Sequence, residues 1–487
     1  YMKHLFVVLF LTLTVGLFAR NEIKSTDEVY RQKDILTVQA TEDSKIEAPS
    51  GSSAPTKLVD KRPQAGSVKK RLKSISFGTT EWTLSNDVVV VFRPTEFKEN
   101  EIAFEASSWG GYSKVSTSEL PSAYLINDVM KRNGFDNVSY ADIQKQLSGK
   151  SVNLEASMSE LTENLKGRSS AQDFETLLQL IYLNFQKPYS KDEANFSSTI
   201  DKARTYAANR ANNTQEIFAD SVMMKWNMYD KRCIIFDEAM LKDVSYHKVL
   251  DIFNKRFSAA NDFTFVFIGN IDPEDANIEK LICTWLGSLP KGRTEDASTQ
   301  AFNHPKGAYT SRFGTKVGAD VAVNTLRYYA PMEYSWANLV NMHIIEYIAK
   351  YRCMEKAKGA TPLDVKSFID KYPTETGVLS IQFNCNPKAR EAIVRLIKEE
   401  VKRLIKEGAS SEDFIKAKET MLDKYDADIQ DNRYWASSLV RYYLYGKDYI
   451  NDYRNWIDFI TLESIRDTLD KLVVSENIFE VSMQKEK

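Results

Sequence analysis

The stretch Ser107–Gly134 reads SSWGGYSKVSTSELPSAYLINDVMKRNG and has the pattern of a strand end, a turn at Gly110 and Gly111, and a helix. Its helix signals are, in order, Ser116 and Glu119 at capping-box spacing, Pro121 in the first turn, Lys131 and Arg132 in the last turn, and Gly134 as a stop. We therefore predict one continuous helix directly after a glycine turn.

The segments around this stretch alternate between strand and helix patterns. A hairpin is predicted over Trp82–Phe97, with its turn at 85–87, and a strand over Ile102–Ser107. Further elements are expected as a helix at Tyr140–Leu147, a strand in SVNLEASMS, helices at Ala171–Phe185 and Pro188–Asn213 with Ser190 as N-cap, a helix and strand in Val249–Asn270, and a helix at Ile278–Leu289. Such alternation predicts an α+β fold with antiparallel-rich sheets packed against helices.

The second part of the chain repeats the first. The helical segment after Phe196 corresponds to the one after Phe414, Trp226 corresponds to Tyr442, and the strand from Asn261 corresponds to the one from Glu476. The offsets are 215 to 218 residues. A constant offset of this size indicates two homologous domains.

The length of 487 residues also suits two domains better than one core. We expect a signal peptide at 1–19, a flexible linker-like tail at 20–74, a first domain at 75–290 and a second at 305–487. The tail is predicted from its Ser, Thr, Pro, Lys and Glu content, which leaves little apolar surface to bury.

Composition excludes several classes of partner. Lys and Arg number 65 against 67 Asp and Glu, which gives a net charge of −2, so the protein has no long-range field that would attract nucleic acid or an anionic membrane.

Met2–Ala19 has a basic start, an apolar run and a small residue before Arg20, which is the pattern of a secretory signal peptide. No later segment is apolar enough to span a membrane. We expect an exported, periplasmic protein.

The four cysteines and four histidines form no recognisable metal or catalytic cluster. Cys233, Cys283, Cys353 and Cys385 are scattered singly, which argues against bridges and against structural zinc. His247, His304 and His343 have the surroundings of structural or surface residues. His343 and Glu346 have H-x-x-E spacing, but no second His completes a metal motif.

Several segments together resemble the insulinase/pitrilysin family of zinc peptidases. They are WTLSNDVVVVFRPTEFKENEI, FETLLQLIYLNF, DFTFVFIGNID, LGSLPKGR and APMEYS, in order from Trp82 to Ser335. The resemblance is to the second, non-catalytic half of long periplasmic, PqqL-like members. It implies the two-domain metalloenzyme fold of that family.

Active members of that family carry an H-x-x-E-H zinc motif on the helix after the glycine turn. The register that aligns best puts Tyr124, Asn127 and Asp128 at the His, Glu and His positions, and no His occurs between His4 and His247. A third ligand, a Glu, would lie where this chain has Thr205 or Tyr206. The resemblance therefore implies vacant zinc positions, no cofactor and no catalysis by this chain alone.

In the same family the non-catalytic half contributes an Arg and a Tyr that contact the substrate backbone. YRCMEKAKGATPLDV resembles that stretch, and Arg352 matches the Arg. Pro362 follows Thr361 where Thr-Tyr is usual, so the Tyr has no match. From the residues alone, Arg352 is equally expected to end an amphipathic helix, where a cation stabilises the helix C-terminus.

Two functions follow from the resemblance. The first is a non-catalytic subunit that binds peptide substrate and completes the chamber of an active H-x-x-E-H zinc peptidase subunit. The second is a stand-alone exported binding or scaffold protein that has lost proteolysis. The retained Arg352 favours the first function, whereas the missing Tyr favours the second.

Overall fold

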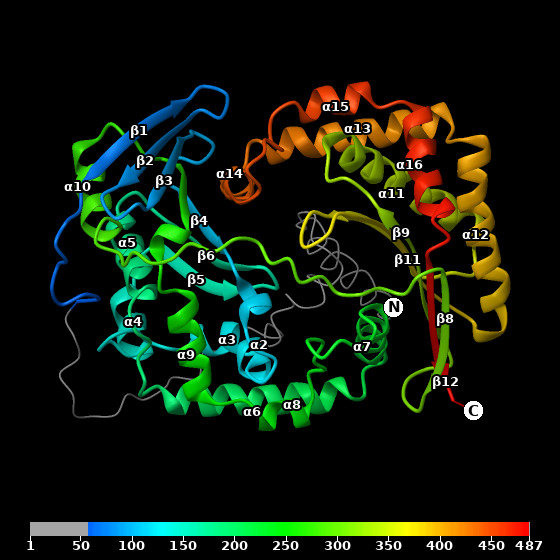
Figure 1. Ribbon diagram of the computed structural model, residues 1–487, viewed down its shortest axis with the longest axis horizontal. Helices are drawn as coiled ribbons and strands as arrows, with labels where there is room; N and C mark the ends of the chain where they lie inside the picture. Colours follow the sequence, from blue (N-terminus) through cyan, green and yellow to red (C-terminus); the bar gives the residue numbers. More distant parts are fainter. Residues whose placement is uncertain (1–56, 487) are drawn as a thin grey trace, which may run out of the picture.

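The structure is a computed structural model that describes residues 57–486 and contains two β-sheets, each packed against helices. The sheets lie at opposite sides of the molecule, with helices around and between them (Figure 1). The predicted α+β fold with two similar domains is confirmed. The predicted signal peptide and most of the predicted tail lie outside the described residues.

The first sheet has seven strands in the order β1-β2-β3-β7-β4-β6-β5. Its strands are β1 (Val68–Ser74), β2 (Thr79–Leu84), β3 (Val89–Pro94), β4 (Ile102–Trp109), β5 (Val152–Met158), β6 (Thr162–Ser169) and β7 (Thr264–Gly269). Only β3 and β7 pair in parallel. The predicted hairpin is confirmed as β2 and β3, which the β-branched run at 88–91 favours.

The second sheet has five strands in the order β10-β11-β9-β12-β8. Its strands are β8 (Ala308–Thr315), β9 (Ala322–Pro331), β10 (Leu363–Asp370), β11 (Thr376–Cys385) and β12 (Ile478–Lys485). This is the order β5-β6-β4-β7-β3 of the first sheet, and β8 and β12 form the corresponding parallel pair. The shared strand order confirms the duplication predicted from the repeat.

The helices also correspond between the two halves. Those of the first half are α2 (Leu120–Tyr124), α3 (Ile126–Met130), α4 (Tyr140–Leu147), α5 (Phe174–Asn184), α6 (Glu193–Arg210), α7 (Thr214–Trp226), α8 (Glu238–Lys242), α9 (Tyr246–Arg256) and α10 (Ala276–Trp285). Those of the second half are α11 (Trp336–Lys356), α12 (Arg390–Glu407), α13 (Ser411–Asp428), α14 (Asn432–Tyr445), α15 (Tyr453–Phe459) and α16 (Leu462–Val474). The starts of α6 and α7 precede those of α13 and α14 by 218 residues each.

The helices of each half cover one face of their own sheet, and one further helix of each half packs on the sheet of the other half. From α7, Phe218, Val222 and Trp226 share a helical face and pack on the second sheet against Phe479 and Val481 of β12. This exchange buries the face of the second sheet that its own helices leave uncovered. It requires the two halves to stay together.

The reciprocal contact is made by α14. Its Trp435, Leu439 and Val440 pack on the first sheet against Val91 of β3 and Val266 of β7. Tyr442 also packs against this cluster, and its equivalence with Trp226 stays a prediction. One face of each sheet is therefore buried in part by residues from the opposite half.

An arginine stacks on the tryptophan of each exchanged helix. The Arg327 guanidinium on β9 lies 4.6 Å from the Trp226 ring centroid, and that of Arg93 on β3 lies 3.7 Å from the Trp435 ring centroid. Arg327 is fully buried. The attraction between a cation and an aromatic ring is stronger in a core without water than at the protein surface.

Some boundaries differ from the prediction. The tail was expected to stay unstructured to Ser74, which is wrong for its last residues, because β1 at Val68–Ser74 pairs with β2. Five of its seven side chains are exposed, so backbone pairing orders this strand without an apolar signal in its sequence. Ser190 is also wrong as an N-cap, since α6 begins after Asp192. The proposed domain boundary near 290–304 stays a prediction.

Replacing Trp226 by Ala should test the helix exchange. The ring is 3% exposed and packs against His304, Tyr329 and Phe479 at centroid distances of 4.3, 4.7 and 5.2 Å. Its loss leaves a cavity and removes the stacking partner of buried Arg327, so we expect a loss of about 3–5 kcal/mol in unfolding free energy. Denaturant titration measures it. Phe459→Ala on α15, where the side chain is 74% exposed, is the matched control and should be nearly neutral.

Candidate functional site

The Gly110–Gly111 turn encloses a buried ion pair. Glu163 is fully buried and accepts hydrogen bonds from Gly111 N at 2.7 Å, Ser108 Oγ at 3.0 Å and Arg256 Nε at 2.5 Å. Burial raises the pKa of the Glu163 carboxyl to about 7, although Arg256 acts in the opposite direction. A Cβ on Gly110 would lie 1.9 Å from Arg256 Nη2, so the glycine is required by this close approach.

The helix after this turn is interrupted. Instead of one helix to Gly134, the chain forms α2 and α3, separated at Leu125, where φ is −96° and ψ is 2°. The Ser116 hydroxyl hydrogen-bonds the Glu119 carboxylate, but no side chain caps the start of α2. The predicted continuous helix is therefore wrong. The helix propensities of the residues do not predict this break, which lies among buried residues.

The side chains at the expected zinc positions have other partners. Tyr124 Oη donates to the carbonyl of Arg232 at 2.9 Å. Asn127 donates from Nδ2 to Met158 O at 3.1 Å and accepts from Met158 N at 2.7 Å, which ties α3 to the end of β5. Asp128 is 8% exposed. These groups do not fit a zinc site with two imidazoles and a catalytic carboxylate.

The third expected position lies on α6. Thr205 is exposed and donates to the backbone of Asp201 at 3.0 Å, whereas Tyr206 is half-buried beside Phe236. Within residues 57–486, no three His, Cys, Asp or Glu side chains gather as a metal site would require. The four cysteines, all within this range, are buried free thiols.

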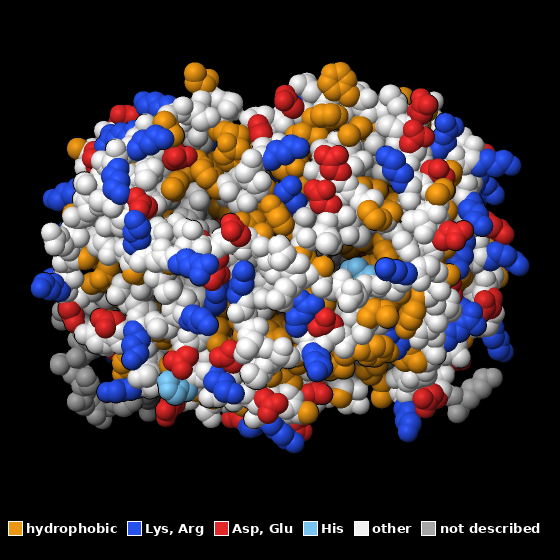
Figure 2. Space-filling view, in the orientation of Figure 1, with side chains coloured by type: hydrophobic (Ala, Val, Ile, Leu, Met, Phe, Trp, Pro, Cys, Tyr) orange, Lys and Arg blue, Asp and Glu red, His pale blue; other side chains and the backbone are white. Residues whose placement is uncertain are grey.

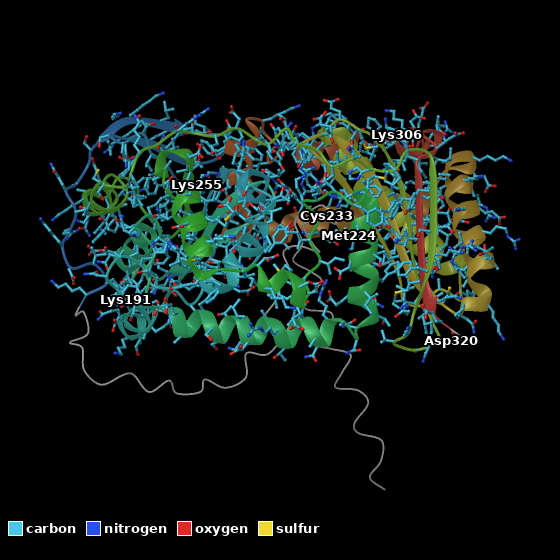
Figure 3. All side chains as sticks on the ribbon, turned by 60° about the horizontal axis from the view of Figure 1, so that its bottom comes forward. Lys191, Met224, Cys233, Lys255, Lys306 and Asp320 are labelled. Carbon is cyan, nitrogen blue, oxygen red and sulfur yellow. The ribbon has the colours of Figure 1, made fainter. Side chains whose placement is uncertain are left out.

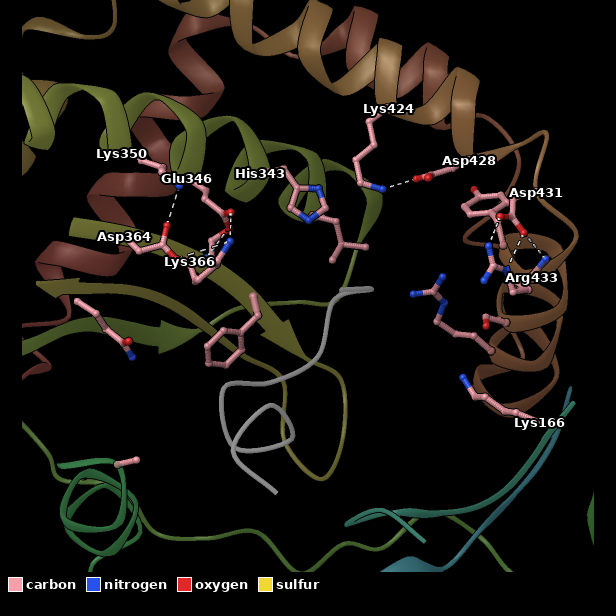
Figure 4. A pocket seen from close by; sticks show the side chains of 18 of the residues that line it. Lys166, His343, Glu346, Lys350, Asp364, Lys366, Lys424, Asp428, Asp431 and Arg433 are labelled. Atoms are coloured by element: carbon pink, nitrogen blue, oxygen red, sulfur yellow. Dashed lines mark hydrogen bonds and ion pairs between the residues drawn. The ribbon is translucent and has the colours of Figure 1, made fainter. Parts of the chain in front are cut away.

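A cavity of about 1980 Å³ lies between the two halves. Residues of both sheets and of α6, α7, α11, α13 and α14 line it. Figure 4 shows Lys166 of β6 and Arg433 of α14 across the space from His343 of α11. The cavity therefore exists only because both halves are present.

One face of α11 carries polar residues into this cavity. His343, Glu346, Tyr347 and Lys350 recur at helical spacing, and all four line the cavity. Glu346 accepts from Ser367 N at 2.7 Å, and Lys350 pairs with Asp364 at 2.8 Å (Figure 4). The sequence surroundings of His343 predict only a structural or surface residue. The signal for its place in the cavity wall is the helical spacing of these four polar residues, opposite the apolar face of α11.

Charges along the cavity wall are largely paired. Lys424 bonds to Asp428, Arg433 pairs with Asp431 at 2.8 Å, and Lys166 pairs with Glu105 at 3.1 Å. The outer surface is similarly mixed, with charges of both signs interspersed over the face shown in Figure 2. The wall therefore offers no concentrated charge of one sign.

Comparisons with known proteins agree with this architecture. Residues 243–421 match the family described as Peptidase M16 inactive domain. A PQQL-like zinc protease of Arabidopsis thaliana is 25% identical over 448 residues, covering 87% of this chain and 44% of that protein. This chain is an M16-like peptidase homologue related to PqqL. M16 is the insulinase/pitrilysin-type family that the sequence motifs indicated.

Solved structures have the same fold. The periplasmic protease PqqL from Escherichia coli is 15% identical, with a TM-score of 0.75, over 91% of this chain and 49% of that one. The peptidase M16 inactive domain from Pseudomonas fluorescens is 14% identical, with a TM-score of 0.69, over 84% of this chain and 98% of that one. The chain spans about half the length of the PqqL-like relatives. Within residues 57–486, no helix has the length and apolar character that a bilayer crossing requires.

Arg352 lies beside this cavity but is engaged elsewhere. Its neighbours Lys350 and Tyr351 line the cavity, whereas Arg352 Nε bonds to Glu400 Oε1 of α12 at 2.9 Å. Glu400 is 1% exposed and also pairs with Arg403 at 3.3 Å. Because α11 continues to Lys356, Arg352 does not end the helix as expected. Its contact with a peptide stays a prediction.

Arg352→Ala should destabilise the protein, because the buried Glu400 carboxylate would keep only Arg403. We expect a loss of about 1–3 kcal/mol in unfolding free energy. Arg403→Ala is the matched variant, since it removes the other partner of the same carboxylate. Arg395→Ala, on the same helix and 71% exposed, should be neutral in the same denaturant titration. An Arg352→Ala protein as stable as wild type would contradict a structural role for this pair.

The imidazole of His343 should make stability depend on pH. Burial, with a smaller contribution from Lys424, lowers its pKa from 6.5 to about 4. The unfolded chain therefore binds more protons between pH 6.5 and 4, so folding stability falls as the solution is acidified through this window.

Relative to His343→Gln, wild type should lose about 1–3 kcal/mol more between pH 7 and pH 4. The measurement is unfolding free energy against pH. His247→Gln is the control, because that side chain is 86% exposed, and it should keep the wild-type slope. If unfolding free energy varied with pH in the same way for wild type and His343→Gln, the lowered pKa of His343 would be refuted.

Proposed function

We propose that this chain is a non-catalytic peptidase homologue that binds peptide in the cavity between its halves. In this role it completes the chamber of a zinc-dependent peptidase whose active subunit carries H-x-x-E-H. The observation that carries the proposal is the cavity of about 1980 Å³, which is lined by both halves. This volume exceeds the roughly 300–1,000 Å³ of sites for small molecules, so a chain-like ligand suits it better.

The residues at the former zinc positions support a non-catalytic role. Tyr124 and Asn127 form hydrogen bonds to backbone groups of Arg232 and Met158. The aligned motif has Asp128 in place of its second histidine and contains no histidine. Activation of water by zinc needs three protein ligands and an open position. Hydrolysis would therefore require those groups from a second subunit.

The compartment is proposed from the sequence and from the solved structure of PqqL from Escherichia coli. The apolar run at Met2–Ala19 and the description of that PqqL as periplasmic support an exported, periplasmic location. An active subunit would then be expected in the same compartment.

The alternative is a stand-alone exported binding or scaffold protein. It is favoured by the sequence, which has Thr361 and Pro362 where the family's substrate-contacting Tyr is expected. Under this alternative the chain binds peptide, or serves as a scaffold, without contributing to proteolysis.

The proposal predicts that the chain co-purifies with an H-x-x-E-H peptidase of its source organism and raises that enzyme's rate of peptide hydrolysis. The isolated chain should bind no stoichiometric zinc and cleave no peptide. If Arg352 contacts the peptide, Arg352→Ala should lower the stimulated rate by about tenfold or more, the equivalent of a lost charge-assisted hydrogen bond. Elemental analysis and peptide hydrolysis with and without the chain are the measurements.

Arg403→Ala controls for the shared ion pair with Glu400 and should leave the stimulated rate closer to wild type. Absence of a complex, with hydrolysis indifferent to the chain, would favour the stand-alone alternative. One zinc per isolated chain together with chelator-sensitive hydrolysis would overturn both non-catalytic functions.

A further inference from the structure

We propose that the former zinc side of the cavity is a pocket for one large apolar or aromatic side chain of the bound peptide. This apolar pocket is defined by Tyr124, Tyr206, Ile234, Phe236 and Met240, all of which line the cavity. The inference rests on the proposed peptide-binding function and specifies which peptides bind best.

The pocket is built around the loop that joins α7 to α8. This loop contains Cys233, which is labelled near the middle of the molecule in the view of Figure 3. At one end, the Arg232 carbonyl accepts the hydrogen bond from Tyr124 of α2 at 2.9 Å. At the other end, the Phe236 carbonyl accepts from Arg210 Nη1 of α6 at 3.2 Å. The loop is thus fixed to both helices that would carry zinc ligands in an active member.

The side chains of this loop keep apolar surface toward the cavity. Ile234 and Phe236 are half-buried, and the Phe236 ring lies 5.6 Å from the Tyr206 ring at an interplanar angle of 64°. Tyr124 is half-buried and meets Tyr112 edge-on at 4.9 Å. A further aromatic or aliphatic group can complete these ring contacts, because edge-to-face packing adds to the gain from burial.

Charge complementarity also favours a neutral side chain. Arg232 of the loop pairs with Asp230 at 2.8 Å, and Arg210, which binds the loop from α6, is held by Asp220 through two bonds of 2.7 Å and by Glu216 at 3.2 Å. These arginines therefore have carboxylate partners already and give little attraction to an acidic side chain. A lysine in the peptide would lose hydration against aromatic walls, where burial of a charge is costly.

Binding of a matched peptide series to the full chain tests the pocket. Fluorescently labelled peptides would share one sequence and vary at a single central position, occupied by Phe, Leu, Ala, Glu or Lys. We expect the Phe and Leu peptides to bind about tenfold or more tightly than the Ala peptide, and the Glu and Lys peptides to gain nothing over Ala. Fluorescence anisotropy gives the dissociation constants.

Phe236→Ala should reduce the Phe-to-Ala preference to within about threefold, because the ring wall is lost. Tyr206→Ala should do the same and serves if the first variant fails to fold. Tyr347→Ala is the matched control, since it removes an aromatic group from the α11 wall of the same cavity, and the preference should persist.

Equal affinity for all five peptides, or a preference unchanged by Phe236→Ala and Tyr206→Ala, would overturn this inference and leave peptide binding in place. Failure of every peptide to bind would instead overturn the proposed peptide-binding function, and the pocket with it. The two failures are therefore distinguishable.

Discussion

The reciprocal packing of α7 and α14 is the contact on which the rest of the structure depends. Val91 and Val266 are fully buried because α14 of the second half covers them, and Phe479 and Val481 are fully buried in the cluster that α7 contributes to. A sheet with an apolar second face must bury it against another layer. Neither half can do so alone, so the exchange fixes the two sheets relative to one another.

The same constraint produces the cavity. While Trp435 and Leu439 of α14 seal the first sheet, Arg433 and Ser437 on its other side line the cavity. Ser437 Oγ also donates to Glu105 Oε2 at 2.6 Å, which ties the helix to β4. Because one helix both closes a core and lines the cavity, a substitution that loosens the exchange should also change the site.

Sequence patterns predicted the elements whose signals are local. The β-branched run at 88–91 identified β3, and the sequence offsets of 215 to 218 residues identified the duplication. Sequence patterns could not predict which sheet α7 or α14 packs on, because the apolar face of a helix does not specify the surface that it contacts. β1 was missed because its side chains are mostly exposed, and the break at Leu125 because no Gly or Pro stands there to indicate it. At the site, alignment placed Tyr124, Asn127 and Asp128, but the loop at 232–236 that contacts Tyr124 is over 100 residues away in sequence.

At the aligned positions the backbone, like the side chains, does not fit an H-x-x-E-H zinc site. The H-x-x-E-H arrangement needs its ligands on successive turns of one continuous helix, whereas here Tyr124 belongs to α2 and Asn127 to α3. The Asn127 amide satisfies both the N–H and the carbonyl of Met158 at the end of β5, which an imidazole or a carboxylate could not do together. Restoring the motif at these positions would leave one of those half-buried backbone groups without its partner, at a cost of about 1–3 kcal/mol. The packing around Tyr124 and Asn127 therefore fits hydrogen bonds between side chains and backbone better than it fits a metal site.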